Sequence, residues 1–226
     1  MYKEVKGTKI IHFQGEEFVL SSDRVLYYPS ENALILSDIH LGKAGHFRKN
    51  GIPVPIQINQ DNLDRLDSCI QKFNPKKLIF LGDLFHSELN SEWDDFRDWR
   101  SGHSARSMTL VLGNHELYSA QKYEGLGLEV VDWIDINGLR LQHEPEKTNN
   151  RLFNSSSNPA SISGHLHPGV KLAGKGRQSL ILPCFAHYEH QLILPAFGTF
   201  TGLHLITIKE AQQLYAIAED ELITLK

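Results

Sequence analysis

Runs of apolar residues separated by turn-forming residues predict a chain rich in strands. Three β-like runs open the sequence: KIIHF (9–13), EFVLSS (17–22) and RVLYYP (24–29). Three further runs continue without alternation of apolar and polar residues: ALILS (33–37), KKLIFLGD (76–83) and SMTLVLGNHE (107–116). Unbroken apolar runs of this length are typical of strands that are buried on both faces. We therefore predict three buried strands, each of which leads into polar residues.

Two amphipathic segments separate these buried strands. The first, over about residues 58–73, has apolar side chains at helical spacing and is ended by Pro75. Its apolar positions are Leu63, Leu66, Ile70 and Phe73. The second, SEWDDFRDWR (91–100), has Ser91 as a helix cap, and its aromatic residues fall on one side. The spacing predicts one helix in each gap.

The second half of the chain changes to strand and turn. Asn137-Gly138 predicts a hairpin within LEVVDWIDINGLRLQHE (128–144), and GKGR predicts another within VKLAGKGRQSLILP (170–183). NNRLFNSSSNPAS (149–161) predicts a surface loop. Further β-like runs follow at SISGHLHP (161–168), GLHLITI (202–208), LYAIAE (214–219) and LITLK (222–226).

This order of elements predicts a mixed αβ (α+β) protein. Two packed β-sheets should lie face to face with the helices outside them, because each sheet must bury an apolar face. The chain has no internal repeat, and its 226 residues suit one domain. We expect a single domain over residues 1–226.

Polar motifs stand where five of the predicted strands end. They are SDIH (37–40), GDLFH (82–86), GNHE (113–116), LQHE (141–144) and GHLHP (164–168). Binding sites in open α/β sheets form beyond the carboxyl ends of strands, where successive loops converge. Gly82, Gly113 and Gly164 precede three of the motifs and permit tight turns and close backbone approach. We expect the Asp, Asn and His side chains to meet at one edge.

The mixture of side chains in these motifs indicates a metal site. Imidazoles and carboxylates without thiolates suit first-row metals such as Mn, Fe, Zn or Ni. Seven such groups are too many for one tetrahedral ion. They suit two ions about 3.5–4 Å apart that share a bridging carboxylate, an arrangement used in phosphate ester hydrolysis.

In chain order, the motifs D-x-H, G-D, G-N-H-E, H and G-H-x-H resemble the calcineurin-like metallophosphoesterase superfamily over residues 38–167. The resemblance implies an αββα sandwich and two divalent metal ions, with Mn expected and Fe, Zn, Ni or Mg as alternatives. One ion would be held by Asp38, His40 and His167, Asp83 would bridge the two ions, and Asn114, His143 and His165 would complete the second site.

The same resemblance implies the catalytic residues of a metal-dependent phosphoesterase. A metal-bridging hydroxide would attack the phosphodiester. His115 would protonate the leaving oxygen or steady the phosphate, and Glu116 would orient His115 through a hydrogen bond. Many family members have Asp where Glu116 stands, a modest departure.

A narrower resemblance concerns the substrate. LSDIHLGKAGHFRKNGIPVP (36–55) and LPAFGTFTG (194–202) are similar to bacterial DNA ligase-associated metallophosphoesterases. That subfamily implies cleavage of DNA, as an endonuclease in DNA repair, beside an ATP-dependent DNA ligase, a helicase and an exonuclease. His46, Arg48 and His86 could bind the substrate, with Arg suited to bidentate phosphate contacts. A solvated loop and a structural histidine explain these three residues about equally well.

Composition and charge exclude several classes of protein. The net charge of −4 argues against a broad, nonspecific phosphate-binding surface, although not against a local one. No segment approaches the roughly 18 apolar residues of a membrane span, and the N-terminus lacks a signal-type apolar segment. Cys69 and Cys184 lie far apart without a CxxC motif, so no disulfide framework is indicated. We expect a cytoplasmic protein without a membrane partner.

Two other functions fit the same motifs. A small-molecule phosphodiesterase or phosphatase, acting on a nucleotide or lipid precursor, would have a closed pocket. A nucleic-acid enzyme would have a groove open on at least one side, with basic flanks. A non-catalytic scaffold in a DNA repair assembly would purify largely free of metal. Edge strands in the C-terminal third could pair between subunits, which would give a homo-oligomer.

Overall fold

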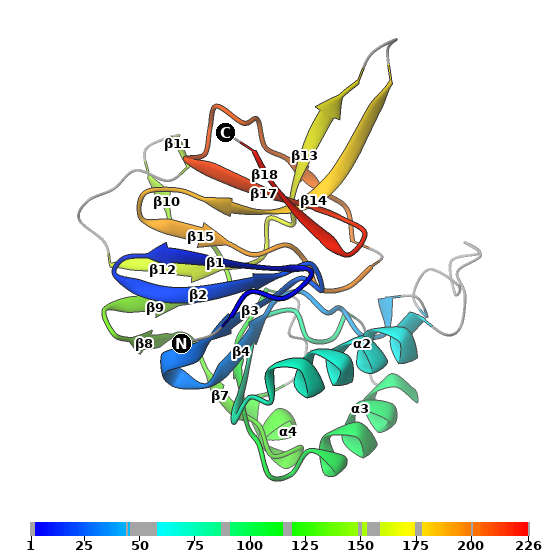
Figure 1. Ribbon diagram of the computed structural model, residues 1–226. Coiled ribbons are helices and arrows are strands. Elements are labelled where there is room, and N and C mark those ends of the chain that lie inside the picture. Colours follow the sequence, from blue (N-terminus) through cyan, green and yellow to red (C-terminus); the bar gives the residue numbers. More distant parts are fainter. Residues whose placement is uncertain are drawn as a thin grey trace.

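The computed structural model describes residues 3–43, 45, 58–86, 91–114, 119–148, 151–152, 159–174, 178–199 and 201–225. Two mixed β-sheets form the body of the protein, and helices flank them (Figure 1). This arrangement confirms the predicted fold class.

The first sheet has seven strands in chain order. They are β1 (Thr8–Phe13), β2 (Glu16–Ser21), β3 (Val25–Tyr28), β4 (Ala33–Leu36), β5 (Lys77–Leu81), β6 (Ser107–Val111) and β7 (Glu129–Val131). Strands β1 to β4 pair antiparallel, with the short 3₁₀ turn η1 (Pro29–Glu31) before β4. From β4 to β7 the pairing is parallel, so the carboxyl ends of β4, β5 and β6 lie at one edge.

The second sheet is built from the C-terminal half of the chain. Along its main path the strands are β16 (His204–Leu205), β13 (Pro168–Ala173), β14 (Ser179–His187), β15 (Gln191–Ile193), β12 (Ala160–Ser163), β9 (Leu139–Leu141) and β8 (Ile134–Ile136). Strand β17 (Gln213–Ala218) also pairs with β14, and β18 (Glu221–Leu225) pairs with β17. Strands β9, β12 and β15 are parallel. A separate two-stranded pair joins β10 (Lys147–Thr148) to β11 (Arg151–Leu152).

The absence of alternation in the central strands follows from burial on both faces. In β4, Ala33 and Ile35 belong to the core between the two sheets, whereas Leu34 and Leu36 belong to the core beneath the helices. Helices α2 (Ile58–Phe73), α3 (Ser91–Gly102) and α4 (Ala120–Gly125) all contribute to that second core. Burial of apolar surface at about 25 cal/mol per Å² is the dominant favourable term in such packing.

Most predicted elements are confirmed. The first helix has the predicted limits, and Asn137 (φ 51°) and Gly138 (φ 79°) form the two-residue turn of the β8–β9 hairpin. Strands β13 and β14 form the hairpin predicted over GKGR. No helix in the described ranges is long and apolar enough to cross a membrane.

Other expectations were wrong or incomplete. Residues 128–144 do not form one hairpin, because β7 pairs with β6 in the first sheet before the chain crosses to β8 in the second. The segment 149–161 contains strand β11 and the start of β12, not only loop. Helix α4 and strand β15 were not predicted. Both are short, six and three residues, and neither has a clear period.

Candidate metal centre

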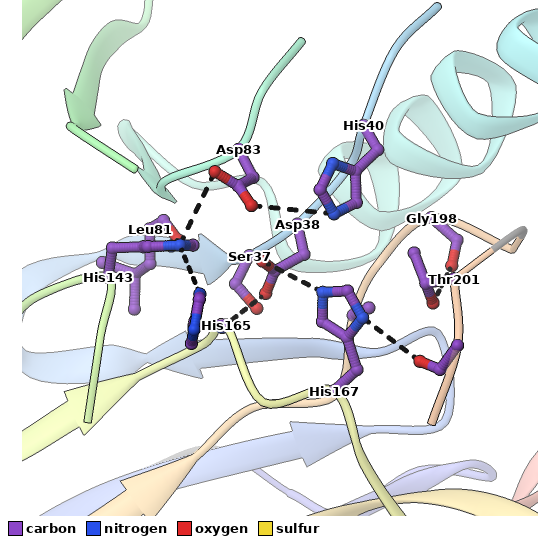
Figure 2. Close-up of polar contacts among 12 residues, drawn as sticks. Ser37, Asp38, His40, Leu81, Asp83, His143, His165, His167, Gly198 and Thr201 are labelled. Atoms are coloured by element: carbon purple, nitrogen blue, oxygen red, sulfur yellow. Dashed lines mark hydrogen bonds and ion pairs between the residues drawn. The ribbon is translucent and has the colours of Figure 1, made fainter. Parts of the chain in front are cut away.

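The structure brings all seven predicted metal ligands together at the carboxyl ends of strands from both sheets. Asp38 follows β4, Asp83 follows β5 and Asn114 follows β6 in the first sheet. His143 follows β9 in the second sheet, and His165 and His167 both follow β12. Figure 2 shows the carboxylates and imidazoles of this edge pointing toward one another. Packing of one sheet on the other therefore builds the site.

These side chains form two groups that could each hold a cation. The first group is Asp38, His40 and His167, and the second is Asp83, His143 and His165. Within each group the candidate ligand atoms all lie within 4.8 Å of one another. Asn114 adjoins the second group, where its Oδ1 lies 2.9 Å from Nε2 of His143.

Asp83 lies between the two groups. Its Oδ2 is 3.7 Å from Nε2 of His40, and its Oδ1 is 3.6 Å from Nε2 of His143. The carboxylate is 2% exposed, so water contributes little to its solvation. One oxygen thus faces each group, which is the arrangement that a bridging carboxylate requires.

The backbone of the site is held in an unusual conformation. Five of the seven side chains come from non-glycine residues in the left-handed region: Asp38 (φ 54°), His40 (φ 53°), Asp83 (φ 51°), His165 (φ 65°) and His167 (φ 49°). Each such residue costs roughly 1–2 kcal/mol, and clusters of them occur at active sites. Hydrogen bonds hold the turns, because the His40 amide donates to the Asp83 carbonyl (2.9 Å) and the Asp38 amide to the Gly82 carbonyl (3.2 Å).

Glycines make room for the ligands. A Cβ on Gly82 would overlap the His143 ring, and a Cβ on Gly113 would overlap Oδ1 of Asp83. At Gly164 a Cβ would lie 2.5 Å from Oδ2 of Asp38. Gly82 also has a φ of 75°, which other residues rarely adopt. The close approach expected of these three glycines is confirmed.

Gly164→Ala should therefore displace Asp38 without removing any ligand. We expect at least about a tenfold loss of Mn²⁺ affinity and a destabilisation of about 1–3 kcal/mol, as is usual for overpacking. Isothermal titration with Mn²⁺ and thermal unfolding would measure the two effects. Gly102→Ala is the matched control, because nothing lies within 4 Å of a Cβ built there. Equal Mn²⁺ binding by the two variants would contradict the prediction.

Hydrogen bonds orient the rings of His143 and His167, two of the predicted ligands. Nδ1 of His143 lies 2.9 Å from the Leu81 carbonyl, and Nδ1 of His167 lies 3.2 Å from the Gly202 carbonyl. Because a carbonyl can only accept, each Nδ1 donates to it, which leaves Nε2 as the nitrogen that could bind a metal ion. These tautomers present Nε2 to the centre of the site.

Atoms that could bind a metal ion lie close to one another, as they would around a bound cation. Nε2 of His143 faces the acceptor Oδ1 of Asn114 at 2.9 Å. Nε2 of His167 and Oδ1 of Asp38 lie 3.2 Å apart, and neither of these buried atoms has another hydrogen-bond partner among the described residues. Buried acceptors without donors are unfavourable unless something positive lies between them. The residues present therefore fit two metal ions.

The protonation states agree with this interpretation. Burial lowers the pKa of His40 to about 2, and burial followed by the neighbouring His143 lowers the pKa of His165. Burial raises the pKa of Asp38, but the hydrogen bond and electrostatic interaction with His167, followed by the interactions with His143 and His40, outweigh it and hold the pKa below its usual value. Neutral imidazoles and ionised carboxylates are the forms that bind metals.

The predicted catalytic residues His115 and Glu116 lie outside the described residues, as do His46 and Arg48. His86 is described and half-buried, and its ring centroid is 5.3 Å from that of His40. It therefore lies beside the first group, and its role in substrate binding stays a prediction.

Lys43 is a residue near the site that sequence reasoning missed. Its side chain is half-buried, and burial lowers its pKa, while the charges of Asp38 and Asp83 raise it. An ammonium group thus lies within electrostatic reach of both groups. The signal was present in the sequence, because Lys43 lies three residues after the first motif in SDIHLGK.

A broadly open pocket of about 520 Å³ lies beside Asn114 and His143 of the site. Three carboxylates line it, those of Asp132, Glu144 and Glu146. The openness is what a nucleic-acid enzyme requires, whereas the acidic lining differs from the basic flanks expected for one. The charges around the site are thus unevenly distributed: acidic side chains line the pocket, and Lys43 is not among its lining residues.

Comparisons with known proteins agree with this geometry. The calcineurin-like phosphoesterase family model matches residues 32–164, more than half of the chain. Among solved structures, the nuclease MPE of Pseudomonas putida is 30% identical to this chain and superposes with a TM-score of 0.78. That match covers 96% of this chain and 100% of the nuclease.

Two further structures are more distant. The phosphoesterase Yfce from E. coli is 15% identical, with 85% of this chain and 97% of its own covered and a TM-score of 0.47. Protein AQ665 of unknown function from Aquifex aeolicus is 18% identical, with 64% and 82% covered and a TM-score of 0.41. These two similarities are too low to indicate a function. No protein with a curated description matches significantly. From the family match and the nuclease match, we conclude that this chain belongs to the calcineurin-like phosphoesterase family and is a metal-dependent phosphoesterase.

Proposed function

We propose that this protein is a dinuclear phosphodiesterase whose substrate is DNA. The observation that carries the dinuclear part is Asp83, whose two oxygens each face one ligand group at 3.6–3.7 Å. The DNA part is supported by the similarity to a nuclease at 30% identity over 96% of the chain. It is also supported by the resemblance of segments 36–55 and 194–202 to DNA ligase-associated phosphoesterases.

The seven ligands would hold two divalent cations. Asp38, His40 and His167 would bind one, Asp83 would bridge, and Asn114, His143 and His165 would bind the other. When bound, such ions act as Lewis acids on phosphate oxygens and bring the pKa of bound water close to neutrality. We propose Mn²⁺ as the active ion from the family resemblance, with Fe, Zn, Ni or Mg as alternatives, and mixed imidazole, carboxylate and amide ligands without thiolate are compatible with it.

The chain's own residues would perform the remaining tasks. Leu81 and Gly202 accept hydrogen bonds that hold the His143 and His167 rings in the metal-binding tautomer. Lys43 would compensate negative charge on the phosphate. We propose that His115 gives its proton to the leaving oxygen, and that Glu116 orients the His115 ring. His46, Arg48 and His86 are proposed to contact the substrate phosphate.

The direction of the bound strand follows from charge. The acidic pocket lined by Asp132, Glu144 and Glu146 repels a second phosphate. We therefore propose that the backbone phosphates that flank the cleaved one lie away from this pocket. A base, whose exocyclic amino group can donate hydrogen bonds to carboxylates, would fit there instead. Association with an ATP-dependent DNA ligase, a helicase and an exonuclease is proposed from the sequence resemblance alone.

A paired assay tests the proposal. With Mn²⁺ added, the protein should hydrolyse a chromogenic phosphodiester in preference to the matching monoester, and it should cleave labelled single-stranded or duplex DNA. Metal analysis should find two ions per chain. Cleavage of nucleotides or lipid precursors without any DNA cleavage would favour the small-molecule enzyme. A chain that binds no Mn²⁺ would favour the scaffold and contradict the proposal.

A further inference from the structure

A crossing segment (residues 194–199) connects the two sheets at the metal centre. At its start, the Leu194 amide donates to the Ser163 carbonyl of the second sheet (2.8 Å). Three residues later, the Phe197 amide donates to the Ser37 carbonyl at the end of β4 in the first sheet (2.8 Å). An isolated parallel bridge between Ser37 and Ala196 lies between these points. The segment thus fastens the end of β12 to the end of β4.

The crossing segment contacts the first ligand group directly. The Gly198 amide donates to the Asp38 carbonyl (3.0 Å), and a Cβ on Gly198 would overlap the Ile39 carbonyl. Just beyond the segment, the Gly202 carbonyl accepts from Nδ1 of His167 (3.2 Å). Figure 2 shows Gly198 and Thr201 beside the His167 ring. The same short stretch therefore orients ligands that come from different sheets.

Two arginines hold the opposite side of the crossing segment. Nη1 of Arg24 donates to the carbonyls of Gly198 (3.1 Å) and Ala196 (3.4 Å). Nη2 of Arg65 donates to the carbonyl of Phe197, and its guanidinium lies 4.1 Å from the centroid of the Phe197 ring. Three successive carbonyls thus receive their donors from two side chains. Buried carbonyls need such donors when no neighbouring strand supplies them.

Placing two cations so close together is unfavourable unless both are held by acceptors. Burial, followed by the charge of Arg24, lowers the pKa of Arg65 to about 10. Burial also lowers the pKa of Arg24. Both side chains nevertheless remain charged at neutral pH, and a planar guanidinium can serve several carbonyls at once. A lysine at either position would present one compact charge instead.

We propose that Arg24 and Arg65 are positioning residues for the first ligand group. Through the crossing segment they set the Asp38 backbone and the His167 ring relative to each other. This inference rests on the proposed dinuclear function. It also gives the segment LPAFGTFTG (194–202), which the metal motifs leave unexplained, a role at the site.

Mn²⁺ titration of Arg65→Ala tests the role. Outer partners of metal ligands typically affect metal affinity about 10–100-fold. We expect that loss at one of the two sites, with the affinity of the other site unchanged. Arg24→Ala should show the same selective loss, and Arg65→Lys should be intermediate. Arg97→Ala is the control, because Arg97 is an exposed arginine of α3 that pairs with Asp94.

A double variant identifies which site is affected. His167→Ala removes a predicted ligand of the first group, so the site that remains intact is the second. Adding Arg65→Ala should not change the Mn²⁺ affinity of that second site, because both changes act on the first group. A further loss of Mn²⁺ affinity at the second site in the double variant would overturn the proposal. Unchanged Mn²⁺ affinities in a folded Arg65→Ala protein would also overturn it.

A purely structural role of Arg24 and Arg65 would give a different result in these measurements. It would lower the melting temperature and weaken both sites alike, which would overturn the positioning role. If Arg65→Ala does not fold, the same titration of Arg65→Lys and Arg24→Ala decides. Failure of the wild-type protein to bind two ions would instead refute the proposed function, so the two failures are distinguishable.

Discussion

Asp83→Ala should abolish turnover and remove at least one of the two metal ions. The carboxylate faces both ligand groups, with Nε2 of His40 at 3.7 Å and Nε2 of His143 at 3.6 Å. Each oxygen of this carboxylate faces one group, so alanine would leave each group one potential ligand short. Loss of several kcal/mol of charge stabilisation corresponds to a fall in kcat of about 10³-fold or more. Steady-state kinetics and metal analysis of the same preparation would measure both effects.

Asp98→Ala is the matched control for this change. Asp98 is an exposed aspartate of α3 whose side chain is 75% exposed, and it should affect neither metal content nor turnover. Asp83→Asn separates charge from shape, because the amide keeps one acceptor oxygen but no negative charge. We expect it to retain more metal than alanine and still to lose most activity. An Asp83→Ala protein with wild-type turnover would refute the bridging role.

His115→Ala should have the second-largest effect and a different signature. General acid catalysis typically contributes about 10²–10⁴-fold, so kcat should fall by that factor. His115 is not among the seven proposed ligands, so both ions should stay bound. The comparison of kcat with metal content therefore distinguishes His115 from Asp83. Loss of an ion from His115→Ala would contradict its proposed role.

The leaving group offers a sharper test of the same residue. A 4-nitrophenolate leaves without needing a proton, whereas the alkoxide of a sugar leaves poorly unless it is protonated. The defect of His115→Ala should therefore be small for a nitrophenyl diester and large for a dinucleotide. His12→Ala, at an exposed histidine of β1, is the control and should behave as wild type with both. Equal defects with both esters would exclude proton donation.

Local patterns predicted the strands and helices well because they reflect forces within a few residues. The unbroken apolar runs at β4, β5 and β6 are buried on both faces, as their composition indicates. Asn137-Gly138 forms its two-residue turn because both residues tolerate positive φ. Short elements such as β15 escaped prediction, because three residues do not show a period.

The sequence alone determined which residues could bind metal. Motif order and residue type pointed to a site for two metal ions, and the resemblance to calcineurin-like metallophosphoesterases implied the seven predicted ligands and a bridging role for Asp83, because the chemistry of a ligand belongs to its side chain. The positive φ angles of five ligands could not be predicted, because non-glycine residues adopt them only when surrounding contacts compel it.

Only the tertiary structure decided how the two halves of the centre meet. Asp38 and Asp83 come from one sheet, and His143, His165 and His167 come from the other. Their distances depend on how the sheets pack and on the crossing segment, which is held by Arg24 and Arg65. These contacts join residues more than 130 positions apart, as between Arg65 and Phe197. No local pattern records them, because long-range packing is the sum of many weak contacts whose geometry the chain acquires only when folded.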